Sequence, residues 1–183
     1  MIGAITSGLY GTGAPPVIPS NFYSIATYNP SAISTVTFSS IPNTYTHLQV
    51  RLSMIGVSGG SLLVACFNGD TGTNYTWHDL NGQGSTASGY GATAQNFARI
   101  FGRNVGTSST SPTGSVIDLL DYTNTNKNKV MRALSGMDAN GSGEIELESS
   151  LWLNTSAISS LTVKTHDGTN FASGTSIALY GVL

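Results

Sequence analysis

The pattern of apolar and polar positions is clearest between residues 47 and 54. Eight residues there alternate strictly between polar and apolar side chains, in the order His47, Leu48, Gln49, Val50, Arg51, Leu52, Ser53 and Met54. Because successive side chains of a strand point to opposite faces, this period of two predicts a strand with one buried face. Weaker patterns predict further strands at residues 35–38, 62–67, 75–80, 97–101, 116–122, 129–134, 144–153, 160–165 and 176–183.

Turn-forming residues stand between nearly all of these predicted strands. Asn, Asp and Gly tolerate the positive φ of tight hairpin turns, and they cluster at residues 68–70, 81–82, 138–141 and 167–168. No helical stripe longer than two turns is visible. Short strands joined by such turns predict an all-β fold, a single antiparallel β-sandwich with jelly-roll-like topology, over residues 21–183.

Two segments are too polar for strands and too long for tight turns. Residues 82–95 and 102–114 are rich in Gly, Ser and Thr, and both are predicted to be loops. Long loops of a compact domain either move freely at the surface or carry contacts, and the sequence leaves both alternatives open. Tyr90 is the aromatic residue of the first segment, so it is a candidate for binding a partner.

Residues 1–20 differ from the rest of the chain. Three prolines there lack the backbone donor that a helix needs, so an extended N-terminal arm is predicted ahead of the sandwich. The arm is either a disordered tail or a segment held by a neighbouring subunit, and its apolar residues favour the second alternative. The predicted partner-binding residues of the arm are Ile2, Ile5, Leu9, Tyr10, Val17 and Ile18.

Charge is scarce in this chain. Only 9% of the residues are charged, seven are Lys or Arg, and the net charge at pH 7 is −2. Such a chain lacks the cationic surface that displaces counterions from DNA or RNA, so no nucleic-acid partner is predicted. The longest apolar run, residues 62–67, is far shorter than the roughly 20 residues of a membrane-spanning helix, so no membrane partner is predicted. The first residues have neither the basic leader nor the apolar stretch of a signal peptide.

Residues 138–149 partly match a calcium-binding loop. They fit the pattern D-x-[DN]-x-[DNS]-G, including Gly143 at the sixth position, but Ser149 stands where the twelfth position requires a bidentate Glu. Acidic residues alternate with apolar ones as on a strand, at Glu144, Glu146 and Glu148. The segment is therefore predicted to be a hairpin turn followed by a strand with an acidic outer face. No metal or other cofactor is predicted.

The sequence holds no recognisable catalytic motif. It has no G-x-S-x-G nucleophile motif and no Gly-rich phosphate loop, and its three histidines, His47, His78 and His166, are far apart. Asp118 and Asp121 could serve glycoside hydrolysis only by facing each other across a groove, and nothing in the sequence pairs them. The chain is accordingly predicted not to be an enzyme. The single cysteine lies inside the longest apolar run and is predicted to be a small buried side chain.

In their order and spacing, several runs of residues resemble one group of proteins. The runs are residues 41–51 and 67–75, Ile117–Asp118 with 121–127, Leu151–Trp152 with Ala157–Ile158, and 170–175 with 178–182. The group consists of structural proteins of tailed-bacteriophage particles, and the resemblance extends from roughly Ile33 to the C-terminus. It implies a structural component of a virion. It supplies no catalytic residues, and the arm lies outside it.

The expected function is that of a capsid decoration, or cement, protein. Such a subunit would bind the major capsid protein or other virion proteins and neighbouring copies of itself. A homo-oligomer, with a trimer favoured, is predicted in the virion after assembly in the host cytoplasm. The alternative is a tail-fibre or baseplate domain that binds host surface carbohydrate, and a hydrolase domain of the same particle is third. Six aromatic residues could stack on sugars if they were exposed: Tyr75, Trp77, Tyr90, Phe97, Trp152 and Phe171. Most of them are expected to fill the core instead.

Overall fold

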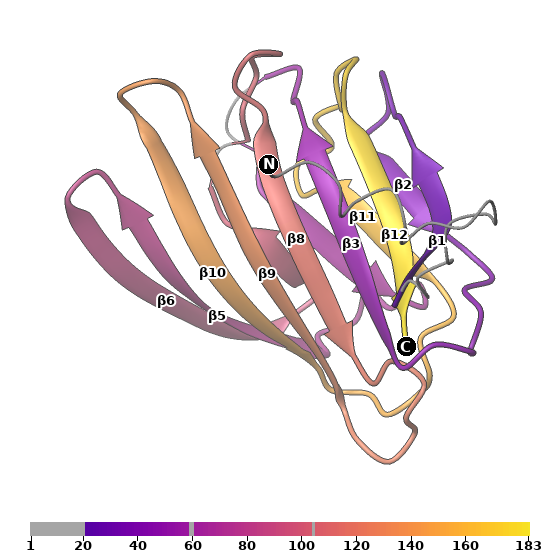
Figure 1. Ribbon diagram of the computed structural model, residues 1–183. Coiled ribbons are helices and arrows are strands. Elements are labelled where there is room, and N and C mark those ends of the chain that lie inside the picture. The colour runs from indigo at the N-terminus through magenta and orange to yellow at the C-terminus, as the bar shows by residue number, and fades with distance from the viewer. Residues whose placement is uncertain (1–20, 59–60, 104) are drawn as a thin grey trace, which may run out of the picture.

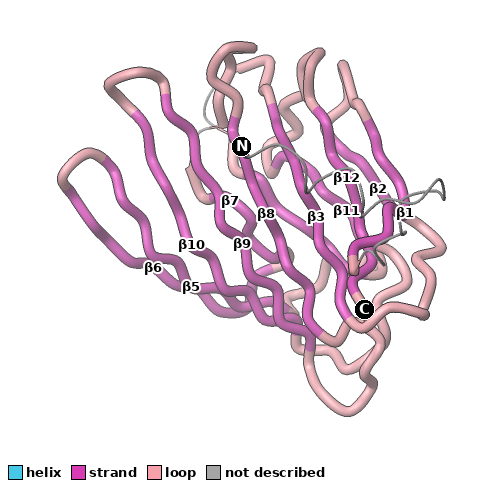
Figure 2. The backbone as a smooth tube through the Cα atoms, viewed as in Figure 1, coloured by secondary structure: helices cyan, strands magenta, loops and turns pink. Residues whose placement is uncertain are grey.

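The structure is a computed structural model that describes residues 21–58, 61–103 and 105–183. The described residues form twelve strands and no helix (Figure 2). The strands are β1 (Phe22–Tyr28), β2 (Thr35–Phe38), β3 (His47–Met54), β4 (Leu63–Phe67), β5 (Tyr75–Gln83), β6 (Thr86–Gln95), β7 (Ala98–Phe101), β8 (Thr113–Leu120), β9 (Lys129–Asp138), β10 (Gly143–Trp152), β11 (Leu161–Thr165) and β12 (Ser176–Val182). Across this described part of the chain, nothing has the helical length and apolar character needed to cross a membrane. The arm and its predicted contact residues, Ile2, Ile5, Leu9, Tyr10, Val17 and Ile18, lie outside the described residues.

The strands form two antiparallel sheets that pack face to face. The larger sheet has the order β1-β12-β3-β8-β9-β10-β5-β6, and the smaller has the order β2-β11-β4-β7. Figure 1 shows the eight-stranded sheet in front and strands of the four-stranded sheet behind it. The predicted all-β, antiparallel sandwich is confirmed. Its strand order is consistent with the jelly-roll-like topology, which stays a prediction.

The core lies between the two sheets, as the alternation of β3 predicts. The four apolar residues of that strand point into the core and are buried: Leu48, Val50, Leu52 and Met54. Beside them, Phe67, Tyr75 and Trp152 pack together with ring centroids 5.6–6.3 Å apart. Cys66 is buried, as its place in an apolar run predicts. Most of the aromatic side chains therefore stabilise the sandwich by burial rather than facing solvent.

Two strands were not predicted, and one of them replaces an expected loop. Residues 82–95, predicted to be a loop, form the end of β5 and the whole of β6. Strand β6 lies at the edge of the sheet, pairs with β5 alone and is exposed at most positions, so its sequence shows no apolar alternation. Strand β1 is the other edge, and a bulge between Ser24 and Ala26 breaks its period of two. The described part of 102–114 remains a loop up to the start of β8.

The predicted hairpin at residues 138–149 is confirmed, but its strand faces the other way. Strand β9 ends at Asp138 and β10 begins at Gly143. The prediction of an acidic outer face is wrong, because Glu146 and Glu148 are fully buried and point toward β7. The apolar residues between them point outward instead, with 57% of Ile145 and 51% of Leu147 exposed. This reversal determines the surface described next.

Candidate functional site

The outer face of the eight-stranded sheet, which points away from the four-stranded sheet, carries a row of apolar side chains. The strand register places four of them opposite one another on β5, β10, β9 and β8: Leu80, Leu147, Leu134 and Val116. Between 41% and 60% of each residue is exposed. Outward positions of an antiparallel sheet are normally polar, so this leucine row is a candidate contact surface.

A second row, closer to the β9–β10 turn, consists of small residues apart from Ile145, which projects from it. From β6 to β12 it consists of Ala87, Gly82, Ile145, Gly136, Gly114, Ser53 and Ser176. A Cβ added at Gly114 would have no neighbouring atom within 4 Å, so lack of room does not require glycine there. Glycine weakens a strand by roughly 0.5–1 kcal/mol relative to alanine, and it often marks a place where another backbone approaches closely. This glycine row therefore leaves the backbone of the sheet accessible from outside.

The leucine row and the glycine row border a groove. Its volume is about 1100 Å³, and a hollow of about 300 Å³ adjoins it. The groove crosses the strands from Arg51 on β3 to Gln83 and Gly84 at the β5–β6 turn. The hollow is lined mainly by apolar side chains, namely Leu80, Ala87, Leu134, Ile145 and Leu147. We call the groove and its hollow the outer groove.

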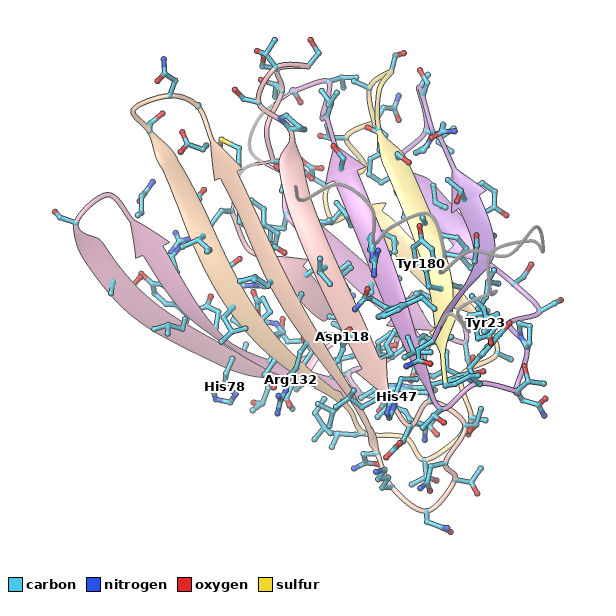
Figure 3. All side chains as sticks on the ribbon, viewed as in Figure 1. Tyr23, His47, His78, Asp118, Arg132 and Tyr180 are labelled. Atoms are coloured by element: carbon cyan, nitrogen blue, oxygen red, sulfur yellow. The ribbon has the colours of Figure 1, made fainter. Side chains whose placement is uncertain are left out.

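A polar row borders the leucine row on its other side. Across the sheet it contains His78, Ser149, Arg132, Asp118, Gln49 and Tyr180. Figure 3 shows His78, Arg132, Asp118 and Tyr180 on this face. Asp118 accepts a hydrogen bond from Gln49 Nε2 at 2.8 Å, and the Arg51 guanidinium lies 5.0 Å from the centre of the Tyr180 ring. The apolar groove thus has a polar rim, as protein contact surfaces usually do.

Directly behind the outer groove, the other face of the same strands holds a buried ion cluster. Arg99 of β7 reaches into it and forms ion pairs with Asp79 of β5 and with Glu146 and Glu148 of β10. The Arg99 guanidinium also lies 4.0 Å from the centre of the Trp77 ring. The side chains of all three carboxylates are fully buried. These ion pairs keep the acidic side of β10 inward, and so keep its apolar side outward.

The ion cluster has more negative than positive charge. Its three carboxylates lie within 4.8 Å of one another, a spacing that could hold a metal ion, but the Arg99 guanidinium occupies the space between them. Burial raises the pKa of Glu148 to about 7, against the opposing effect of Arg99. Protonation of Glu148 therefore offsets part of the excess negative charge near neutral pH. Arg99, rather than a metal, is the cation for which these side chains are arranged.

Tyr90, the predicted contact residue within the described part, lies on the opposite side of the sheet from the outer groove. It stands opposite Asp79 in the register of β5 and β6, and its backbone N–H donates to Asp79 Oδ1 at 2.7 Å. Its ring is 54% exposed, and the Arg103 guanidinium lies 5.4 Å from the ring centre. The structure does not bring Tyr90 together with the groove.

The side chains considered for catalysis form no shared site. Asp118 bonds to Gln49 on the outer face, whereas Asp121 pairs with Lys127 in the turn after β8. His47 accepts a hydrogen bond from the Asp121 backbone N–H at 2.9 Å through Nδ1. His78 is exposed on β5, at the other side of the sheet. Each of these groups makes its own local contacts, and no described cleft joins them.

Several residues that carry the resemblance to phage structural proteins stabilise turns. Asn68 Oδ1 accepts from the backbone N–H of Ser159 at 2.8 Å, and Asn68 Nδ2 donates to the Ala157 carbonyl at 2.8 Å. The Trp152 indole N–H donates to Asp70 Oδ2 at 2.7 Å. These bonds hold the β4–β5 turn against the loop that follows β10. Many of the matching residues therefore belong to the scaffold, while the outer groove is formed, apart from Arg51, by residues outside the matching runs.

Comparison of the chain with protein-family models, with characterised proteins and with solved structures gives no match. The sequence did not predict the outer groove. The alternation of β10 is equally compatible with an acidic or an apolar outer face, and only Arg99 on the facing strand decides between them. The glycines gave no signal either, because Gly82 and Gly114 fall in a predicted turn and a predicted loop, and Gly136 lies just after the predicted strand 129–134.

Proposed function

We propose that this chain is a structural subunit of a tailed-bacteriophage particle that makes protein contacts through the outer groove. The observation that carries the proposal is the apolar groove on strands whose acidic residues, Asp79, Glu146 and Glu148, are held inside by Arg99. A protein that stayed monomeric would gain nothing by exposing the leucine row, because exposed apolar patches favour association. The resemblance of the turn sequences to phage structural proteins supports the virion as the place of assembly.

The energy available from the outer groove suits a repeated contact. Fully burying a Leu, Ile or Val side chain contributes roughly 1.5–3 kcal/mol, and those of the leucine row begin about half exposed. Each contact would therefore contribute about 1 kcal/mol before the costs of ordering. Several such subunits on one particle would bind through avidity, as a capsid decoration protein bound to the major capsid protein and to its own copies would.

The proposal is tested by measuring how much of the chain is incorporated into purified phage particles. We expect the double variant Leu134→Lys and Leu147→Lys to fold but to be depleted from particles, because two charges in the groove must be desolvated on contact. The matched control is Leu153→Lys, which changes a similarly exposed leucine outside the sheet. Normal incorporation of the double variant would overturn the proposal. A high copy number in native particles would place the chain on the shell, and a low one on the tail.

A tail-fibre or baseplate domain that binds host carbohydrate is the second candidate. The observation that favours it is the exposed Tyr90 ring beside Arg103, next to Asn81 and Ser88. An exposed aromatic ring with hydrogen-bonding neighbours can stack on a sugar. Glycan-array binding that is lost in Tyr90→Ala and kept in Leu134→Lys would favour this candidate over the first.

A further inference from the structure

We propose that the outer groove is filled by the N-terminal arm, residues 1–20, of a neighbouring copy of this chain. The inference rests on the proposed function, because it specifies the partner at the same surface. Three features of the described structure carry it: the shape of the groove, its lack of charge along both rows, and the position at which the arm enters the fold.

The shape of the groove fits an extended polypeptide. The outer groove crosses six neighbouring strands from β3 to β6, and the five intervals of about 4.8 Å between them give roughly 24 Å. An extended segment of about seven residues has this length. A second sheet packed on this face would lie about 10 Å away and would not need glycines beneath it. A single extended chain lying beside Ile145 would use the space that Gly114 leaves open.

The arm has the composition that the groove requires. Residues 1–20 contain no Asp, Glu, Lys or Arg, and the first ten include Ile2, Ile5 and Leu9. From Val116 to Leu80 the leucine row is likewise uncharged. Three charged residues also line the groove: Arg51 on β3, and Asp138 and Glu144 beside the β9–β10 turn. Glu144 pairs with Arg103 and Asp138 accepts from the Asn140 backbone N–H, so an arm docked along the leucine row would avoid most of the cost of burying unpaired charge. The glycines of the arm also permit close approach of one backbone to another.

The direction of β1 favours the groove of a neighbour over the chain's own groove. Phe22 pairs with Val182, and β1 then runs along β12 toward Ile177. The arm therefore joins the sheet beside Val182, at one end of β12. The glycine row lies at the other end of that strand, at Ser176. The prolines at residues 15, 16 and 19 favour extended backbone in the segment before β1. An arm that entered its own groove would have to reverse its direction before β1, whereas an arm that reached a neighbour's groove would not.

The length of the arm is sufficient for both parts of this arrangement. In polyproline II geometry, residues 11–20 span about 31 Å, enough to bridge to an adjacent subunit. Residues 1–10 then supply about 33 Å of extended chain, which is enough to cross the groove. Exchange of an arm between identical subunits is a common way to build a homo-oligomer.

Cross-linking between two differently labelled full-length chains tests the inference. One chain carries Ile5→Cys, and the other carries Gly114→Cys and a tag that changes its mass. The two chains are co-expressed and treated with a short bismaleimide. We expect a product that contains both chains. The native chain, whose Cys66 is buried, measures background, and Thr37→Cys on the exposed side of β2 replaces Gly114→Cys as the matched control.

A mixed product above both controls supports docking of the arm in a neighbour's groove. Absence of a mixed product overturns the inference, whether the arm lies in its own groove or nowhere on this face. A chain carrying both cysteines distinguishes these two failures, because an arm in its own groove would give only an internal cross-link. Failure of the proposed function looks different, since the native chain would then be a monomer at all concentrations and absent from particles.

Filling the groove provides a second, independent measurement. Gly114→Leu in the full chain places a side chain where the fold leaves open space, so the variant should fold. We expect its self-association, measured by sedimentation velocity, to weaken about tenfold or more, since one well-placed clash in an apolar contact has this effect. Thr37→Leu should self-associate as the native chain does. Unchanged association of Gly114→Leu would overturn the inference.

Discussion

Arg99 is the residue on which the orientation of β10 depends. Its guanidinium pairs with three buried carboxylates from two strands, and two of these, Glu146 and Glu148, belong to β10. Removing one partner from such a cluster leaves an uncompensated buried charge, which is far more costly than losing a surface ion pair. A single side chain on the facing sheet thus determines which side of a strand meets solvent.

The raised pKa of Glu148 makes stability depend on pH. Because the pKa in the folded state is about 7 and the ordinary value is 4.5, folding favours the protonated form. This contribution to stability is complete below about pH 4.5 and is lost as the pH rises through 7. We expect Glu148→Gln, which stays neutral, to flatten the decline in unfolding free energy over this range, by up to about 3 kcal/mol.

Urea unfolding of the native chain and of Glu148→Gln at a series of pH values checks this expectation. Some dependence on pH should remain in the variant, because burial also raises the pKa of Glu144. A variant with the same slope as the native chain between pH 5 and about 7 would show that Glu148 does not carry the effect.

At the scale of the strand, the glycine row makes a prediction about Gly114. This residue lies within β8, a Cβ there would meet nothing within 4 Å, and its φ is not in the left-handed region. Gly114→Val should therefore stabilise the isolated subunit by about 0.5–1 kcal/mol, because valine is favoured in strands and glycine is not. Thermal unfolding measures the change. Gly143→Ala is the contrasting variant and should destabilise, since its Cβ would lie 2.5 Å from the Met137 carbonyl oxygen.

Strands show how much of this fold the sequence could predict. The alternation in β3 predicted both the strand and its buried face, because only one of its faces is apolar. In β10 both faces were plausible, and the choice depended on Arg99, which lies 47 residues from Glu146 in sequence. Strand β6 gave no signal, because an exposed edge strand has no apolar face to bury. Local pattern therefore predicted the elements, while contacts between distant strands determined the site.

At the scale of the whole molecule, the proposed contact is apolar, so it should respond weakly to salt. Charge–charge contacts weaken as ionic strength rises, whereas burial of apolar surface does not. We expect the self-association of the native chain to be similar at low and high sodium chloride, as measured by sedimentation equilibrium. Dissociation at high salt would instead place the contact on the polar row, where Arg132 and Asp118 lie opposite each other.

The hydrogen bonds that stabilise the turns lie apart from the outer groove, and this separation affects how such a protein can diversify. Asn68 and Asp70 hold the turns from one end of the sandwich, and the residues that line the groove take no part in those bonds. Substitutions at outward positions of β5, β8, β9 and β10 would alter partner choice without disturbing the folding of the scaffold. A lineage could thus exchange one binding partner for another through a few surface changes, while the same sandwich continued to fold.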